Sequence, residues 1–194
     1  MGVASAIVRP SDVDLAVRWM AGSSVQLGTL VDSTHGYSTS AAKNYAARDL
    51  LQRGAKEIDT VMNTGKLVSR QFQYLEMELL QMAESCHQSG AILKVNLESE
   101  FLDEELHIVA CRIARRAGAD YIGTNKLERV AVLNAHSRDR LKIKCHAPIA
   151  DLETALAFRE AGCSRIELAE PGIVLDAWRL ACEKSAAQSP SPNP

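Results

Sequence analysis

Short apolar segments alternate with amphipathic, helix-forming segments along almost the whole chain, and this alternation constrains the fold more than any other feature. Two strands joined by a helix pair in parallel, so the pattern predicts a parallel sheet with helices packed against it. The expected strands cover residues 5–8, 25–31, 57–62, 92–97, 121–124, 142–145 and 165–168. The expected helices cover residues 12–20, 40–53, 70–89, 103–117, 128–135, 152–161 and 172–185.

Residues at the expected helix ends support these boundaries. Ser11, Ser38, Asp103 and Asp151 are expected N-caps, because a short polar side chain there accepts a hydrogen bond from the first helical turn. Glycines follow several of the expected helices, which is typical of helix C-termini that end in a left-handed residue. They stand at positions 54, 90, 118 and 162.

Composition indicates one soluble globular domain. The 46% hydrophobic and 24% charged content is ordinary for such proteins, so we expect a single domain over residues 1–184 and a disordered, serine- and proline-rich tail over 185–194. A net charge of −2 gives no reason to expect a nucleic-acid partner. No apolar run approaches the roughly 18 residues of a membrane span, and the first residues lack a signal-peptide pattern. We therefore expect a cytoplasmic protein with no membrane partner.

The cysteines and histidines give no sign of a metal site or a disulfide framework. The cysteines are odd in number, widely spaced and without a CxxC pair, so buried free thiols in a reducing cytosol are expected. His35, His87, His107 and His136 lie far apart on expected loops or helices, and we interpret them as surface residues. No two histidines or cysteines have metal-ligand spacing, so the sequence predicts neither a metal nor a cofactor.

Several stretches of the sequence resemble the deoxyribose-phosphate aldolase family, over nearly the whole chain to about Asp176. They are Gly-Ala-Lys-Glu-Ile-Asp at 54–59, Leu-Lys-Val at 93–95, Arg-Ala-Gly-Ala-Asp-Tyr-Ile at 116–122, and the stretch 143–156. An open doubly wound sheet would also fit the strand–helix pattern, but no glycine-rich phosphate fingerprint follows any expected strand. The resemblance implies a TIM-type parallel (β/α)8 barrel instead.

The start of the chain departs from that family. Aldolases of this type open with a strand carrying an Asp-His-Thr-like signature and a helix, and neither precedes the first expected strand here. The sequence therefore predicts an incomplete barrel with seven strands. Because an uncovered sheet edge beside an apolar interior favours association, we expect a homodimer with the incomplete side at or near its interface.

Alternation of side chains along each strand places charged residues on the inner face of the sheet. Lys94, Asn96 and Glu98 share one face of their strand, as do Lys142, Lys144 and His146. Asp59 shares its face with Glu57, Val61 and Asn63. A parallel barrel strand is usually apolar on both faces, so these residues indicate a polar interior or rim at the end of the barrel where such enzymes work.

The resemblance also implies a chemistry, and this chain departs from it. In the family one lysine forms a Schiff base with the carbonyl substrate, and a second lysine and an aspartate tune its pKa and move protons. Lys144 matches the second lysine and Asp59 the aspartate, but Gly123 stands at the Schiff-base position and has no nucleophile. The glycines and small polar residues that form the family's phosphate cradle are replaced by Ala147-Pro148 and by Glu167-Leu168-Ala169-Glu170-Pro171.

Three hypotheses follow. In the first, the chain is an enzyme that acts on a non-phosphorylated carbonyl compound by acid–base chemistry, with Asp59, Lys144 and Lys94 as catalytic residues. In the second, it is a non-catalytic relative that binds a partner or small molecule. In the third, Lys126 restores ordinary aldolase chemistry, although alternation puts it on the opposite face. The expected substrate-binding residues are Asn63, Asn96, Gly123, Asn125, His146, Glu167 and Glu170.

Overall fold

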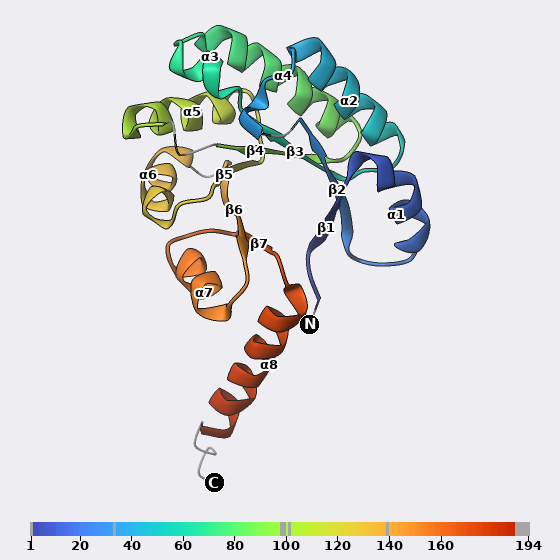
Figure 1. Ribbon diagram of the computed structural model, residues 1–194, viewed down its shortest axis with the longest axis vertical. Coiled ribbons are helices and arrows are strands. Elements are labelled where there is room, and N and C mark those ends of the chain that lie inside the picture. Colours follow the sequence, from blue (N-terminus) through green and yellow to red (C-terminus); the bar gives the residue numbers. More distant parts are fainter. Residues whose placement is uncertain (1, 33, 98–99, 101, 139, 189–194) are drawn as a thin grey trace.

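Seven parallel strands form one curled sheet in the order β1-β2-β3-β4-β5-β6-β7. The structure, a computed structural model, describes residues 2–32, 34–97, 100, 102–138 and 140–188. Every strand pairs with its neighbours in the sequence, and within these ranges no strand joins β7 to β1 (Figure 1). The predicted incomplete barrel of seven strands is therefore confirmed. The strands are β1 (Ser5–Val8), β2 (Gln26–Val31), β3 (Glu57–Val61), β4 (Ile92–Asn96), β5 (Tyr121–Thr124), β6 (Lys142–Ile149) and β7 (Arg165–Leu168).

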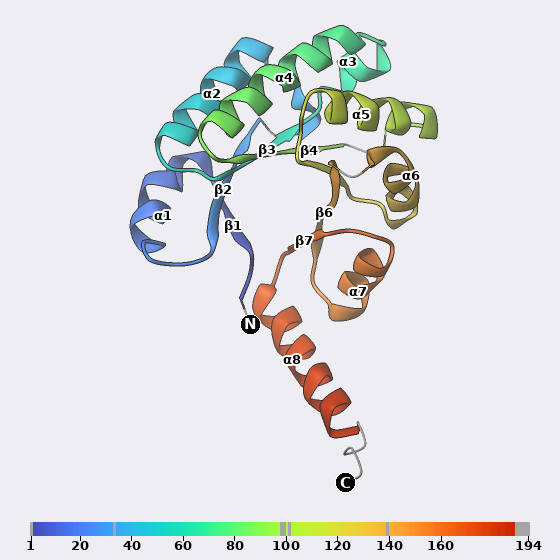
Figure 2. The same ribbon diagram turned by 180° about the vertical axis from the view of Figure 1, so that it is seen from behind.

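The helices cover the outer, convex side of the curled sheet, as Figures 1 and 2 show from opposite sides. The last helix, α8, departs from this layer and extends away from the body of the molecule, beginning beside the N-terminus. The helices are α1 (Val13–Trp19), α2 (Ser40–Gln52), α3 (Thr64–Val68), α4 (Phe72–Gln88), α5 (Glu104–Arg116), α6 (Leu127–Ser137), α7 (Leu152–Glu160) and α8 (Pro171–Gln188), with short 3-10 turns at Pro10–Asp12 and Thr34–Gly36. None of the helices in the described part of the chain combines the length and apolar character that a bilayer crossing needs.

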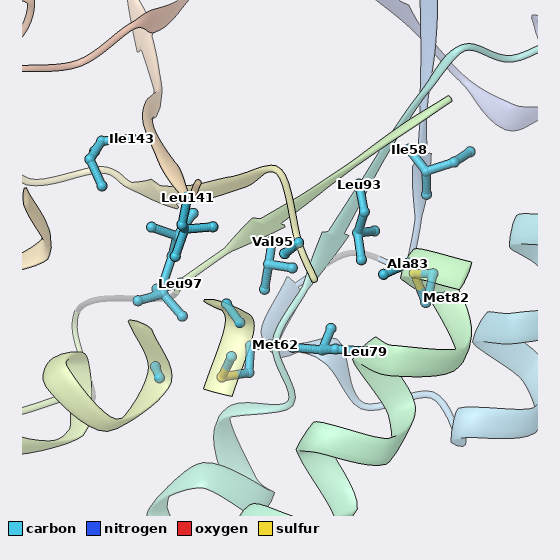
Figure 3. Close-up of a cluster of buried hydrophobic side chains, with 14 of the residues drawn as sticks. Ile58, Met62, Leu79, Met82, Ala83, Leu93, Val95, Leu97, Leu141 and Ile143 are labelled. Atoms are coloured by element: carbon cyan, nitrogen blue, oxygen red, sulfur yellow. The ribbon is translucent and has the colours of Figure 1, made fainter. Parts of the chain in front are cut away.

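The core lies between the sheet and this helical layer. Ile58, Leu93 and Val95 are fully buried on the outward face of their strands, and Leu79 and Met82 of α4 pack against this face (Figure 3). Complete burial of each such side chain contributes roughly 1.5–3 kcal/mol. Because this face holds the apolar residues, the alternate residues of the same strands point into the barrel.

The strand β6 is longer than the sequence indicated. It was expected to end at Cys145, but it continues to Ile149. The pairing with β7 shifts register between Cys145 and Ile149, and such an irregularity accommodates a residue without an N–H donor. Pro148 therefore lies inside the strand without breaking it.

Two of the expected helix caps are confirmed and two are wrong. The side chains of Asp103 and Asp151 accept hydrogen bonds from the first turns of α5 and α7. The cap of α2 is Thr39, not Ser38, because the Thr39 side chain accepts the hydrogen bond from Ala42 N. Ser11 does not cap α1, which begins after a 3-10 turn instead.

Four further features differ from what the sequence indicated. His107 is fully buried rather than exposed, since it lies on the face of α5 that packs inward. Cys182 is exposed, whereas the other four cysteines are buried and free as expected. Helix α8 continues to Gln188, so residues 185–188 are helical, and the rest of the expected tail lies outside the described residues. The short helix α3 was not expected.

Candidate active site

Three charged side chains meet on the inner face of the barrel where β3 and β4 pair. Asp59 and Lys94 are register partners across these strands, and the Lys94 Nζ lies 2.6 Å from the Asp59 Oδ1. The same ammonium donates to Glu57 Oε2 at 2.8 Å. All three side chains are at most 3% exposed. Two carboxylates thus surround one buried ammonium.

This cluster continues in both directions across the barrel. Lys144 of β6 donates to Asp59 Oδ2 and lies 3.2 Å from Glu167 Oε2 of β7. On the other side Arg165 donates to Glu57 Oε1 at 2.9 Å, and also to Ser5 Oγ of β1 at 3.0 Å. The six charged groups form one chain of alternating sign, which we call the inner charge chain. Its members in order are Arg165, Glu57, Lys94, Asp59, Lys144 and Glu167.

The side chains of the inner charge chain can be buried because their charges alternate in sign. An isolated buried charge costs several kcal/mol, and a partner recovers this cost only when geometry and hydrogen bonds are good. Here each inner ammonium contacts two carboxylates, and each of the two buried carboxylates contacts two cations. The three cations and three carboxylates balance to zero formal charge.

The electrostatic surroundings keep Lys144 protonated. Burial by itself lowers the pKa of Lys144, but the neighbouring carboxylates of Asp59 and Glu167 outweigh it, so the pKa lies above its ordinary value. An imine-forming lysine needs a neutral amine at the moment of attack. Lys144 is therefore suited to act as a cation that donates hydrogen bonds, and poorly suited to act as a nucleophile.

A cavity of about 510 Å³ reaches the inner charge chain through the opening between β1 and β7. Lys94, Lys144, Arg165 and Glu167 supply its charged wall. The rest of its lining is mainly apolar and comes from both sides of the opening, namely Val3, Ala4, Ala6, Ile7, Ile166, Leu168, Ala169, Pro171 and Leu175. The access is thus lateral, along the position that an additional strand would occupy.

The expected Schiff-base position is occupied by neighbouring side chains. Gly123 pairs with Asn96 on one side and Lys144 on the other. A Cβ at Gly123 would lie 2.3 Å from Asn96 Oδ1 and 3.2 Å from His146 Cδ2. His146 Nε2 is 3.0 Å from Leu97 O, whereas the buried Asn96 Oδ1 accepts no hydrogen bond from the residues described. The space for a side chain at 123 has been taken by Asn96 and His146.

The structure leaves the other expected binding residues outside this cluster. Asn63 caps α3 by accepting from Lys66 N at 2.9 Å, and Glu170 is exposed just before α8. Asn125 follows β5, with an Oδ1 that is buried and accepts no hydrogen bond from the described residues. Lys126 directly precedes α6 and stands three residues after Gly123, so the alternation of side chains along the chain puts it on the opposite face.

Two members of the inner charge chain were not among the expected site residues. Glu57 stands two residues before Asp59 and so shares its face, a signal already present in the sequence. Arg165 stands two residues before Glu167 in the same way. What the sequence could not give is the pairing of Arg165 with Glu57, because these residues lie on strands that are not neighbours in the sheet.

Comparison with known proteins agrees with this architecture. No family model matches the chain. The deoxyribose-phosphate aldolase of Bacteroides thetaiotaomicron is 31% identical over 180 residues, which cover 89% of this chain and 76% of that protein. The enzyme of the same name from Natranaerobius thermophilus is 34% identical over 170 residues, covering 82% and 76%.

Solved structures agree with the fold. The aldolase QR15 superposes with a TM-score of 0.85 at 27% identity, over 94% of this chain and 85% of that one. The tetrameric deoxyribose phosphate aldolase of Aeropyrum pernix superposes with a TM-score of 0.81 at 21% identity, over 90% and 77%. This chain belongs to the deoxyribose-phosphate aldolase family, as a member with glycine at position 123.

Proposed function

We propose that this protein is an aldolase-like enzyme that acts on a non-phosphorylated carbonyl compound without forming an imine. The observation that carries the proposal is the position of Lys144: it lines the cavity, its ammonium is held between Asp59 and Glu167, and its strand neighbour is Gly123. In this proposal Lys144 stabilises negative charge on the substrate and forms no covalent bond to it.

In this mechanism the Lys144 ammonium donates a hydrogen bond to the carbonyl oxygen of the substrate. Negative charge develops on that oxygen when a carbon–carbon bond next to the carbonyl is formed or broken, and a fixed cation in a partly dry site stabilises it. Asp59 keeps the ammonium charged and oriented, and Lys94 in turn holds Asp59. The same arrangement serves aldol addition, retro-aldol cleavage, elimination or cyclisation.

The cavity is poorly suited to a phosphate group. A phosphate dianion needs unpaired cations or a cradle of backbone N–H groups. Each cation on the cavity wall already contacts a carboxylate, and Glu167 adds a negative charge beside Lys144. Pro148 and Pro171 have no N–H to donate. An uncharged substrate fits these surroundings better.

Two other hypotheses are less well supported. A non-catalytic relative would be expected to fill its interior with apolar side chains, whereas this interior keeps an ionised cluster at the wall of a cavity. Imine chemistry through Lys126 would need that residue to point into the barrel, whereas alternation puts position 126 on the opposite face from Gly123.

The test is turnover on a panel of carbonyl compounds, with 2-deoxyribose 5-phosphate included. We expect carbon–carbon bond formation or cleavage with uncharged aldehydes or ketones, and a loss of at least about 100-fold for Lys144→Met. Borohydride added during turnover should leave the mass of the protein unchanged. Efficient cleavage of 2-deoxyribose 5-phosphate, or a reduced adduct on any lysine, would contradict the proposal.

We also propose that the protein is a homodimer with the open side at or near its interface. Support comes from exposed apolar residues on the edge strand β1 and on α8, the helix that follows the edge strand β7: Ile7 at 36%, Ile173 at 62% and Leu180 at 53%. Light scattering should give about twice the chain mass of 21.1 kDa, and Ile173→Glu with Leu180→Glu should shift it toward the monomer. Tyr45→Glu on α2 is the control. A monomer at micromolar concentration would contradict this.

The four buried free thiols support a reducing compartment such as the cytosol.

A further inference from the structure

The proposed reaction needs a group that takes a proton from the substrate, and two carboxylates contact Lys144. These are Asp59 and Glu167. A general base must come within hydrogen-bond reach of the proton that it removes, so access to the cavity decides between them.

Asp59 is a fixed counter-ion without that access. Its side chain is 2% exposed, one carboxylate oxygen contacts Lys94 and the other contacts Lys144. It is not among the residues that line the cavity. A substrate could reach Asp59 only by displacing an ammonium from it, which would leave a buried charge without its partner.

Glu167 has the access that Asp59 lacks. Its side chain is 43% exposed and belongs to the cavity wall. Only its Oε2 contacts Lys144, at 3.2 Å, and its Oε1 makes no hydrogen bond or ion pair within the described ranges 2–32, 34–97, 100, 102–138 and 140–188. Glu167 stands on β7, the edge strand of the opening, so solvent can exchange its proton.

We propose that Glu167 is the catalytic base of this site and removes a proton from the carbon next to the substrate carbonyl. This inference rests on the proposed function and adds to it the group that moves the proton. The carboxylate of Glu167 takes the proton, the electron pair of the C–H bond forms the carbon–carbon double bond of an enolate, and the carbonyl π pair moves to the oxygen. The Lys144 ammonium stabilises that oxygen by hydrogen bonding.

The second half of the reaction returns the proton. The enolate carbon attacks the carbonyl carbon of an acceptor aldehyde, a carbon–carbon bond forms, and the new alkoxide takes the proton back from Glu167. No oxidant, reductant or further reactant is needed. The apolar cavity wall around Ile7, Ile166 and Leu175 favours an uncharged ketone or aldehyde donor with a small hydrocarbon group.

Hydrogen exchange of a ketone donor in D₂O tests this step apart from bond formation. Butanone is incubated with the protein, and proton NMR follows loss of the signals beside the carbonyl. We expect exchange above the buffer rate with the wild-type chain and a loss of at least about 100-fold with Glu167→Ala. Glu160→Gln, which alters an exposed carboxylate at the end of α7, serves as the control and should keep the wild-type rate.

Rescue by a small carboxylate separates catalysis from a structural role. Glu167→Ala leaves room at the cavity wall, so added acetate should restore part of the exchange, whereas Asp59→Ala should not be rescued because its position is closed. An unchanged rate in Glu167→Ala, or a loss that acetate does not restore, overturns the role of Glu167 and leaves the proposed function standing. Absence of exchange and of turnover in the wild-type chain overturns both.

Discussion

The sharpest consequence of the structure concerns Gly123, where an added methyl group has no room. The backbone there has an ordinary φ, so Gly123→Ala introduces no conformational strain and isolates the steric effect. The new Cβ would lie 2.3 Å from Asn96 Oδ1. Asn96 is 8% exposed, so its side chain cannot simply swing into solvent. We expect Gly123→Ala to destabilise the protein.

The magnitude follows from the cost of overpacking. Inserting one carbon into a well-packed interior typically costs about 1–3 kcal/mol, and the His146 ring carbon at 3.2 Å limits how far the neighbours can relax. For a chain of this length about 2 kcal/mol corresponds to a fall in Tm of roughly 4–8 °C. Asn96→Ala removes the atom that the methyl group would strike, and that atom has no hydrogen bond to lose within the described part of the chain.

A double-mutant cycle measured by urea unfolding tests this. Gly123→Ala should cost about 2 kcal/mol in the wild-type background and less than about 1 kcal/mol when Asn96 is already alanine, a coupling of more than about 1 kcal/mol. Gly65→Ala is the matched control, since its Cβ would meet Asn63 Oδ1 at an ordinary 3.5 Å. It should stabilise helix α3 slightly. Additive costs in the cycle, within about 0.5 kcal/mol, would refute the steric explanation.

Two further predictions concern buried groups outside the site. Burial lowers the pKa of His107, so the folded protein keeps this imidazole neutral where the unfolded chain takes up a proton. The free energy of unfolding should have its full value above the unfolded pKa of about 6.5. It should fall by up to about 1.4 kcal/mol per pH unit as the pH drops from there through the lower folded pKa. His107→Gln should reduce that slope in urea unfolding, and an unchanged slope would contradict the assignment. Burial also raises the pKa of the Cys86 and Cys163 thiols to about 12, so iodoacetamide should modify the native protein at the exposed Cys182 alone and all five cysteines in denaturant. Mass spectrometry with more than one adduct on the native protein would contradict this.

The strands and the inner face could be predicted from the sequence because both depend on local patterns. The bounds of β1, β5 and β7 were predicted to the residue. Alternation placed Asp59, Lys94 and Lys144 on one surface, and the structure brings all three into contact. These are properties of single strands, which the period of side chains along a strand determines.

The contacts within the site and the burial of His107 depend on how separate strands and helices pack together, which no local pattern in the sequence encodes. Asp59 and Lys144 were expected to lie close together with Lys94 nearby, but the sequence did not show that Lys94 contacts the same carboxylate and makes it a bridge between two cations. The filling of the space at Gly123 by Asn96 follows from the register of β4 against β5. Burial of His107 depends on the packing of α5 against its neighbours α4 and α6.

The open side between β7 and β1 and the glycine at position 123 have a common consequence for Glu167. Arg165 and Ser5 are the first residues of β7 and β1, and their side chains meet at 3.0 Å across the opening. This contact, backed by the pairing of Arg165 with Glu57, bridges the opening at the N-terminal edge of the sheet. Glu167 lies two residues further along β7, where it reaches both the cavity and Lys144. A strand placed between β7 and β1 would cover that position. An open side therefore lets Glu167 meet a substrate, and a carboxylate beside a permanent ammonium is the pair that enolate chemistry needs once the imine amine is absent.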